Sequence, residues 1–170
     1  MAKIGELKAV KITWPEDNFG DDIWAMTVDG THFRTEEPSH PDLPKDTSYY
    51  SFKHHCAGFN YELGIALRES KLVWMNGPHP AGKYNDIRIF CECGLLKDKL
   101  EATGMKVIAD KGYYQGYPRL VSLYNSLDDD EVRTFKTRAR LCHEKFNGMC
   151  KVIQCLSDRF RHSRDKLQAC

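Results

Sequence analysis

Apolar residues in the first part of the chain come in short runs separated by turn-forming residues, a pattern typical of strands. Residues 23–28 form such a run, rich in residue types that favour strands, and it stops at Asp29. We predict a strand here, which Phe33 and Thr35 extend into either a hairpin or a longer bent strand. Residues 1–22 are mixed and turn-rich, and we expect them to lead into the domain.

Two further strands are predicted before the middle of the chain. Residues 54–67 and 71–76 are strand-like, and a turn at 60–61 should divide the first of them. Prolines and polar groups predict a surface loop over 36–51, and the glycines and prolines of 77–82 predict another. The early strands should therefore pair as a meander.

The spacing of apolar positions changes to that of a helix after residue 85. A helix is predicted over 87–96, and short apolar runs predict strands over 106–110 and 120–124. A long helix is predicted over 131–160, with an interruption near 147–148. The acids that precede this helix favour its start because they complement the free N–H groups and the helix dipole. This order of elements predicts a mixed α/β fold in a single domain.

Composition agrees with one globular domain. The chain has 170 residues, enough for one core, and 41% hydrophobic and 29% charged residues are ordinary values. No apolar run approaches the roughly 20 residues that cross a bilayer, and no signal-peptide core is present, so we expect an intracellular protein that does not enter membranes. The seven cysteines are irregularly spaced and are expected to be reduced thiols.

The net charge of +1 hides an uneven distribution. Residues 131–170 contain ten Lys and Arg against four Asp and Glu, a balance of +6, so residues 1–130 carry −5. A basic C-terminal segment on an acidic body suits a nuclease, with anionic metal ligands and a cationic track for phosphates. A solvated helix rich in Lys and Arg explains the same numbers, and charge alone does not separate the two.

Three acids fall at positions that suit a metal site. Asp29 and Asp110 each end a predicted strand, where a carboxylate is costly unless it is paired or binds a cation. Glu144 lies 34 positions after Asp110 on the predicted long helix, far enough for the chain to return over the sheet. Three converging carboxylates suit Mg²⁺ or Mn²⁺, and two such ions can activate a water and stabilise the leaving oxygen of a phosphodiester. The alternative is that all three are ordinary surface acids.

The segments around these acids resemble a known family. Residues 28–32, 109–113 and 139–151 are similar, in order, to the three acidic blocks of Harbinger-type DDE transposases. Residues 77–90 look like the family's glycine-rich loop, which runs into an Asp and a short helix. The resemblance covers about residues 24–160, nearly the whole chain.

The resemblance implies an RNase H-like α/β fold, a mixed sheet flanked by helices in a single domain over 23–162, followed by a tail over 163–170. The implied activity is metal-dependent cleavage of DNA, followed by strand transfer by the freed 3′-hydroxyl. Asp29, Asp110 and Glu144 would then be the catalytic ligands of two Mg²⁺ or Mn²⁺ ions.

Four more residues receive expected roles from the same resemblance. Asp86 should support the site without binding metal. Arg140 and Lys151 are four residues before and seven after Glu144, on the same helical face, and with Lys111 they should contact DNA phosphates. The alternative for Arg140 and Lys151 is that they only make the helix soluble.

Expectations about partners and location also follow. Family transposases usually carry a helix-turn-helix segment before the catalytic domain, and this chain starts too close to Asp29 to contain one. We therefore expect a fragment, a decayed copy, or a protein that borrows a separate DNA-binding partner. DNA as substrate, a homo-oligomer and a nuclear location are implied by the family. A non-enzymatic nuclear protein derived from such a transposase, and an RNase H-like nuclease acting on RNA or branched junctions, remain alternatives.

Overall fold

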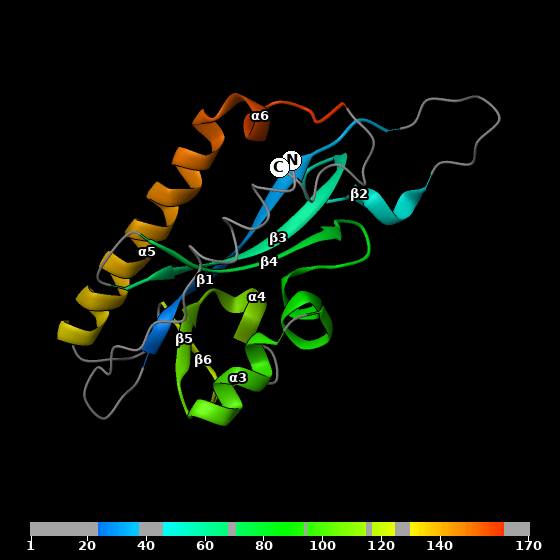
Figure 1. Ribbon diagram of the computed structural model, residues 1–170. Helices are drawn as coiled ribbons and strands as arrows, with labels where there is room; N and C mark the ends of the chain where they lie inside the picture. Colours follow the sequence, from blue (N-terminus) through cyan, green and yellow to red (C-terminus); the bar gives the residue numbers. More distant parts are fainter. Residues whose placement is uncertain are drawn as a thin grey trace, which may run out of the picture.

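A curled mixed sheet runs through the molecule, with the long helix α5 along one face and the shorter helices α3 and α4 on the other (Figure 1). The computed structural model of the protein describes residues 24–37, 46–67, 71–93, 95–114, 117–124 and 130–161. The expected lead-in over 1–22 and the expected tail over 163–170 lie outside the described residues, so the domain boundaries stay predictions.

In the described part of the chain, β1 to β4 come first, short helices and the strands β5 and β6 follow, and the long helix α5 and the short helix α6 come last. In chain order they are β1 (Trp24–Arg34), the 3-10 helix η1 (Thr47–Tyr49), β2 (Tyr50–Ser51), β3 (Cys56–Ala66), β4 (Leu72–Pro80), α2 (Asp86–Arg88), the π-helix η2 (Ile89–Cys93), α3 (Leu96–Thr103), β5 (Lys106–Ala109), α4 (Lys111–Tyr114), β6 (Val121–Leu123), α5 (Asp130–Val152) and α6 (Gln154–Ser157). The predicted mixed α/β character is confirmed.

β1 lies in the middle of the sheet and joins its two halves. It pairs antiparallel with β3, and β3 pairs antiparallel with both β2 and β4. On its other side β1 pairs parallel with β5, and β5 pairs parallel with β6. The predicted meander of the early strands is therefore confirmed, and the two later strands add a parallel half.

β1 extends beyond its apolar run, and β3 is one strand without the predicted internal turn. β1 continues through Asp29 to Arg34, which confirms the longer-strand alternative, because its ladder with β3 runs unbroken from Met26 to Arg34. The predicted turn at 60–61 is wrong, since Asn60 and Tyr61 pair with residues of β1 in that same ladder. Two adjacent strands thus extend well past the point where the acid Asp29 lies.

β4 also extends into a segment that was predicted as a loop. It runs to Pro80, with Pro80 and His79 paired to β3, so only the last part of 77–82 is a turn. The register shifts between Asn60 and Glu62, next to Gly77, whose φ of +141° suits glycine. Prolines are tolerated because, among the described strands, β4 pairs only with β3 and lies at an edge.

The helices differ from prediction in where they break. The helix predicted over 87–96 is present as α2, a π-helical segment and α3, in place of one continuous helix. α5 passes through Asn147 and Gly148 without the predicted interruption, and the chain leaves the helix at Ile153 instead. The predicted helix end near residue 160 is therefore too late.

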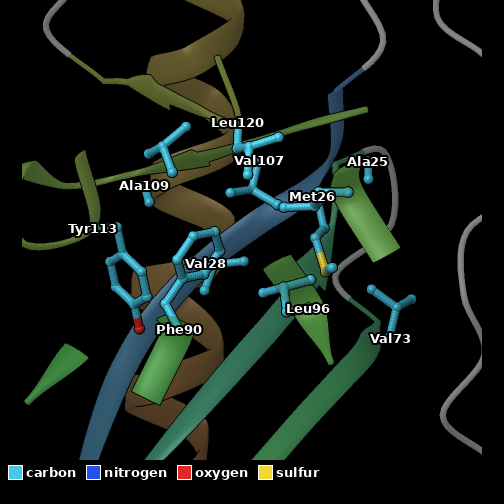
Figure 2. Packing of buried hydrophobic residues seen from close by; sticks show 12 residues of the cluster. Ala25, Met26, Val28, Val73, Phe90, Leu96, Val107, Ala109, Tyr113 and Leu120 are labelled. Atoms are coloured by element: carbon cyan, nitrogen blue, oxygen red, sulfur yellow. The ribbon is translucent and has the colours of Figure 1, made fainter. Parts of the chain in front are cut away.

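The larger core lies between the sheet and the short helices. Met26 and Val28 of β1 meet Phe90, Leu96 and Tyr113, all fully buried (Figure 2). Phe90 and Tyr113 pack edge to face, with ring centroids 6.1 Å apart. This packing fixes α2, η2 and α4 against the sheet, and these elements carry or flank two of the acids discussed below.

The other face of the sheet is covered by α5. Ala139 packs with Ile108 of β5, and the Thr27 hydroxyl lies 2.8 Å from Nδ1 of His143. Both His143 and Lys136 are almost completely buried, the latter with its ammonium group 5.3 Å from the centre of the Trp24 ring. These contacts set the rotation of α5 about its axis and decide which of its residues face the sheet.

Two features bear on the expectations drawn from composition. The cysteines whose side chains are described are free thiols, namely Cys56, Cys91, Cys93, Cys142 and Cys150. Among the described helices, none is both long and apolar enough to cross a membrane.

Candidate active site

The acids Asp29 and Asp110 lie at the same end of two neighbouring strands. β1 and β5 run parallel, and Thr27 and Ile108 are paired where their ladder ends. Asp29 comes two residues after Thr27, still within β1, and Asp110 comes two residues after Ile108, directly after β5 ends. Parallel pairing therefore brings the two carboxylates to one place on the sheet.

Each of these carboxylates accepts a hydrogen bond from a nearby glycine. The Gly30 N–H donates to Oδ1 of Asp29 at 2.8 Å, and the Gly112 N–H donates to Oδ1 of Asp110 at 2.7 Å. A backbone donor holds a carboxylate in one orientation and favours its charged form. Asp29 is half-buried and Asp110 is exposed, so the pair lies at the boundary between sheet and solvent.

A third acid, Asp86, joins this pair from the first residue of α2. Its carboxylate lies against β1 at Gly30, where an added Cβ would be only 2.1 Å from Oδ1 of Asp86. A Cβ on Gly112 would lie 3.4 Å from the other carboxylate oxygen. The missing side chain of Gly30 therefore makes the space that Asp86 occupies, and Gly112 lies beside the same carboxylate.

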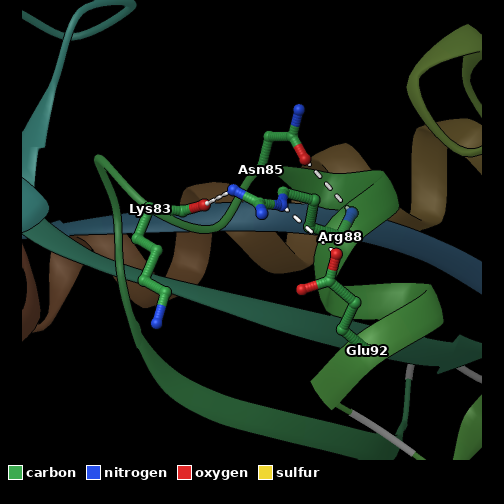
Figure 3. A network of polar contacts seen from close by, with 4 residues as sticks. All are labelled: Lys83, Asn85, Arg88 and Glu92. Carbon is green, nitrogen blue, oxygen red and sulfur yellow. Dashed lines mark hydrogen bonds and ion pairs between the residues drawn. The ribbon is translucent and has the colours of Figure 1, made fainter.

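The loop before α2 is tied down by a small polar network (Figure 3). The Asn85 side chain accepts from the Arg88 N–H at 3.1 Å, which caps α2. The Arg88 guanidinium donates to the Lys83 carbonyl at 2.9 Å and pairs with Glu92 at 3.3 Å. These contacts hold the turn of chain from which Asp86 projects.

The charges of the three acids act on one another. The pKa of Asp29 is raised to about 6, chiefly by burial and also by the nearby charges of Asp86 and Asp110, while the hydrogen bond from the Gly30 N–H acts in the opposite direction. Burial likewise raises the pKa of Asp86, and Asp110 adds to the effect. Three crowded carboxylates favour the uptake of a cation or a proton. Lys53, in the turn between β2 and β3, partly offsets the repulsion by lowering the pKa of both Asp29 and Asp86.

Asn147 of α5, which the sequence patterns did not single out, also contacts the acids. Its amide nitrogen donates to Oδ2 of Asp29 at 3.3 Å, while its oxygen accepts from the Thr31 hydroxyl at 2.9 Å. The signal that could have found it is helical spacing, because Asn147 lies four residues after His143 on the buried stripe of α5.

Glu144 is more exposed than Asp29 and is paired with a cation of its own helix. It is exposed and accepts a hydrogen bond from Arg140 at 2.8 Å, one turn earlier on the helix. The Tyr124 phenol senses the charges of both Glu144 and the aspartates. Burial raises its pKa, the charges of Asp29, Asp110 and Glu144 add to this, and Arg140 opposes it. The charges that shift the pKa of Asp29 come from Asp86, Asp110 and Lys53.

The cations that were expected to contact phosphate are spread around the site. Lys151 lines a hollow beside Asp29. Arg140 is held by Glu144 and lies over the Tyr124 ring, 5.7 Å from its centre. Lys111 is exposed and follows Asp110 directly at the start of α4. Lys53, from a turn with no distinctive sequence pattern, was not expected here.

The donor set suits a hard divalent cation in its chemistry, since carboxylate oxygens are the ligands that Mg²⁺ and Mn²⁺ prefer. Within the part of the chain that the structure describes, however, no three His, Cys, Asp or Glu side chains form a group that could hold one ion. Asp29, Asp86 and Asp110 are close enough to repel one another, and Glu144 is engaged by Arg140.

Comparison with known families agrees with this arrangement. Residues 28–170 match the family described as DDE superfamily endonuclease, and the chain belongs to that family. Membership suggests a nuclease or transposase function with DNA as the substrate. No curated protein and no solved structure shows significant similarity to the chain.

Proposed function

We propose that the chain is the catalytic domain of a Harbinger-type DDE transposase, a metal-dependent endonuclease that hydrolyses phosphodiester bonds in DNA. The observation that carries this proposal is the convergence of Asp29 and Asp110 from neighbouring parallel strands, with Asp86 beside them. Family membership over residues 28–170 supports the nuclease activity. The sheet, in which the antiparallel strands β1 to β4 are continued by the parallel strands β5 and β6, supports an RNase H-like fold.

Asp29, Asp110 and Glu144 are the proposed ligands of two Mg²⁺ or Mn²⁺ ions. The chemistry that such ions supply is activation of a water and stabilisation of the leaving oxygen. The protein's own part is to hold Asp29 between the Gly30 N–H and the Asn147 amide, so that its carboxylate keeps one orientation. Asp86 supports the site by adding negative charge next to both aspartates.

Arg140, Lys151 and Lys111 are the proposed contacts to DNA phosphates. All three are exposed, and they surround the acids from α5 and from the start of α4. Strand transfer by a freed 3′-hydroxyl, a homo-oligomer, a separate DNA-binding protein and a nuclear location belong to the same proposal.

Nicking of supercoiled plasmid tests the proposal. Wild-type protein with Mg²⁺ or Mn²⁺ should convert plasmid to the open circular form, and EDTA should stop the reaction. Asp110→Asn should lower the rate by at least about a hundredfold, a loss typical of removing a group that acts in the transition state. Asp98→Asn, the same change at an exposed acid of α3, is the matched control and should nick like wild type.

Two outcomes would redirect the proposal. Equal nicking by wild type and Asp110→Asn would show that the cut is made elsewhere. No nicking by either protein, with DNA binding intact, would favour a catalytically silent nuclear protein derived from a transposase, which binds DNA or a protein partner. The pairing of Glu144 with Arg140 is the observation that favours this second candidate. Preferential cleavage of an RNA–DNA hybrid over duplex DNA would point to the RNase H-like alternative.

A further inference from the structure

A hollow of about 460 Å³ opens beside Asp29. Its walls come from the second half of β1, from the turn over residues 52–55 between β2 and β3, and from the C-terminal end of α5 with α6. Its volume is within the range of about 300–1,000 Å³ found for ligand sites. Asp29 lies at the border of this hollow, so whatever binds there is a neighbour of the acids.

Three cations from three different elements line the hollow. Arg34 is the last residue of β1, Lys53 lies in the turn, and Lys151 belongs to the last turn of α5. Among the described residues, none of the three has an acid within ion-pair distance. Three cations gathered in a concave surface, against the one carboxylate of Asp29 at its border, create a positive potential that attracts anions.

The three cations converge on one side chain, His54. Burial lowers the pKa of the His54 imidazole, and the charges of His32, Lys53, Lys151 and Arg34 lower it further. Arg34 of β1, Lys53 of the turn and Lys151 of α5 all line the same hollow as this ring. A bound anion would offset the repulsion among them.

The position of the His54 ring is set by its neighbour. It stacks on His32 with ring centroids 4.4 Å apart and an interplanar angle of 14°. Both nitrogens of His32 are engaged, Nδ1 with the Asn60 side chain at 3.1 Å and Nε2 with the Cys56 sulfur at 3.5 Å. In the described part of the chain, the ring nitrogens of His54 have no such partner. The nitrogen that carries the hydrogen is therefore able to donate to a ligand.

The turn itself is built in an uncommon conformation. His55 has a φ of +52°, a left-handed conformation that residues other than glycine adopt rarely. The turn is nevertheless anchored, because the Ser51 hydroxyl accepts from the His54 N–H at 3.3 Å. Strained residues persist where the surrounding structure holds them and often lie at binding sites. Here the conformation presents Lys53 and His54 to the hollow.

We propose that this hollow binds a backbone phosphate of the DNA strand next to the phosphodiester that is cut, with Arg34, Lys53 and Lys151 as its cationic contacts and His54 as a further donor. This rests on the proposed function, which places the scissile phosphodiester at Asp29. Exposed cations from three elements fit a phosphate of a strand lying across the surface, and such contacts fix the register of the strand without reading its sequence. Lys53 lines this hollow together with Asp29 and a second hollow together with Asp86, so it is a neighbour of both the proposed phosphate site and the acids.

Binding without catalysis tests the inference separately from the function. The affinity for a fluorescein-labelled DNA duplex is measured by anisotropy in EDTA, where no cleavage occurs, over a series of salt concentrations. Arg34→Gln, Lys53→Gln and Lys151→Gln should each weaken binding several-fold, and the triple variant at least about thirtyfold near 0.1 M salt. The slope of log affinity against log salt should fall by about one for each cation removed.

The control is Lys145→Gln, the same change on the same helix at an exposed residue that does not line the hollow. It should keep wild-type affinity and slope. Thermal unfolding followed by circular dichroism confirms that each variant is folded. An unchanged affinity and slope in the triple variant would overturn the inference even if wild-type protein nicks plasmid. A weakened triple variant would support the phosphate site even if wild-type protein nicks nothing, in which case only the proposed function fails.

Discussion

The carboxylate of Asp86 occupies the space that a side chain on Gly30 would need. Oδ1 of Asp86 is 2.1 Å from the position of a Cβ on that glycine. The φ of Gly30 is not in the left-handed region, so the requirement for glycine is one of space and not of backbone conformation. Asp86 is thereby kept against β1, and its charge helps to raise the pKa of Asp29.

Replacing Gly30 by alanine should therefore displace Asp86. We expect Gly30→Ala to lower the free energy of unfolding by roughly 1–3 kcal/mol, the usual cost of overpacking, and to lower plasmid nicking at least about tenfold. Gly148→Ala is the control, because nothing lies within 4 Å of its added Cβ. On the exposed helix it should stabilise the protein by about 0.5–1 kcal/mol. Urea unfolding and nicking assays measure both, and wild-type nicking by Gly30→Ala would show that the position of Asp86 does not matter.

A second prediction concerns the hydrogen bonds that hold Asp29 from the side of α5. Asn147→Ala removes both the donor to Asp29 and the acceptor for the Thr31 hydroxyl. We expect a loss of about 1–2 kcal/mol in unfolding free energy, because a half-buried network loses its central member. Nicking should fall about tenfold, since Asp29 is then free to turn.

A double-mutant cycle gives this prediction its control. Thr31→Val breaks the same network from the other end, so its effect and that of Asn147→Ala should not add. Thr31→Ser keeps the hydroxyl and should restore most of the stability. Additive losses would mean that the two residues act independently and that the network does not position Asp29.

The positions of Asp29 and Asp110 at strand ends could be predicted in outline from the sequence. Both acids follow short apolar runs typical of buried strands, whereas the expectation that the two strands are neighbours came from the resemblance to the family. The sequence left the end of the first strand open between a hairpin and a longer strand, because the apolar run stops at Asp29 whereas the backbone ladder with β3 continues to Arg34. Hydrogen bonding between strands, which the pattern of side chains does not record, decides where β1 ends.

The rotation of α5 could not be predicted, and it decides which residue meets Asp29. Residues 144 and 147 differ by about 60° around a helix, at 100° per residue. The contact of His143 with Thr27 turns Asn147 toward Asp29 and leaves Glu144 exposed beside Arg140. Lys53 was missed for a related reason. It reaches the acids from a turn between β2 and β3, and only the tertiary structure places that turn beside β1.

A third prediction addresses Glu144. If it is a metal ligand, as proposed, then Glu144→Gln should lower nicking at least about a hundredfold, as Asp110→Asn does. Its effect on unfolding free energy should stay within about 0.5 kcal/mol, because the pair with Arg140 is exposed. Arg140→Gln removes the partner without removing the acid, and we expect its nicking to exceed that of Glu144→Gln clearly. Glu131→Gln, at an exposed acid in the first turn of α5, is the control for the charge change. Normal nicking by Glu144→Gln would exclude this residue from the site.

The last prediction concerns pH and the buried imidazole of His143. Burial lowers its pKa from 6.5 to about 4, with a smaller opposing effect of Glu144. Between these two pH values the unfolded chain binds a proton that the folded protein does not, so the free energy of unfolding should fall as the pH falls from 6.5 to 4. The contribution of this one group is on the order of 3 kcal/mol.

Glu62 has the opposite effect in an overlapping range, and the measurement must separate the two. Burial raises its pKa from 4.5 to about 7, so through this group alone stability should fall as the pH rises between those values. Urea unfolding of wild type, His143→Gln and Glu62→Gln at intervals from pH 4 to 8 gives the three curves. The difference between wild type and His143→Gln should grow toward high pH, and the difference between wild type and Glu62→Gln should grow toward low pH. Parallel curves for wild type and His143→Gln would mean that His143 titrates alike in the folded and unfolded chains, and that its contact with Thr27 does not depend on the neutral ring.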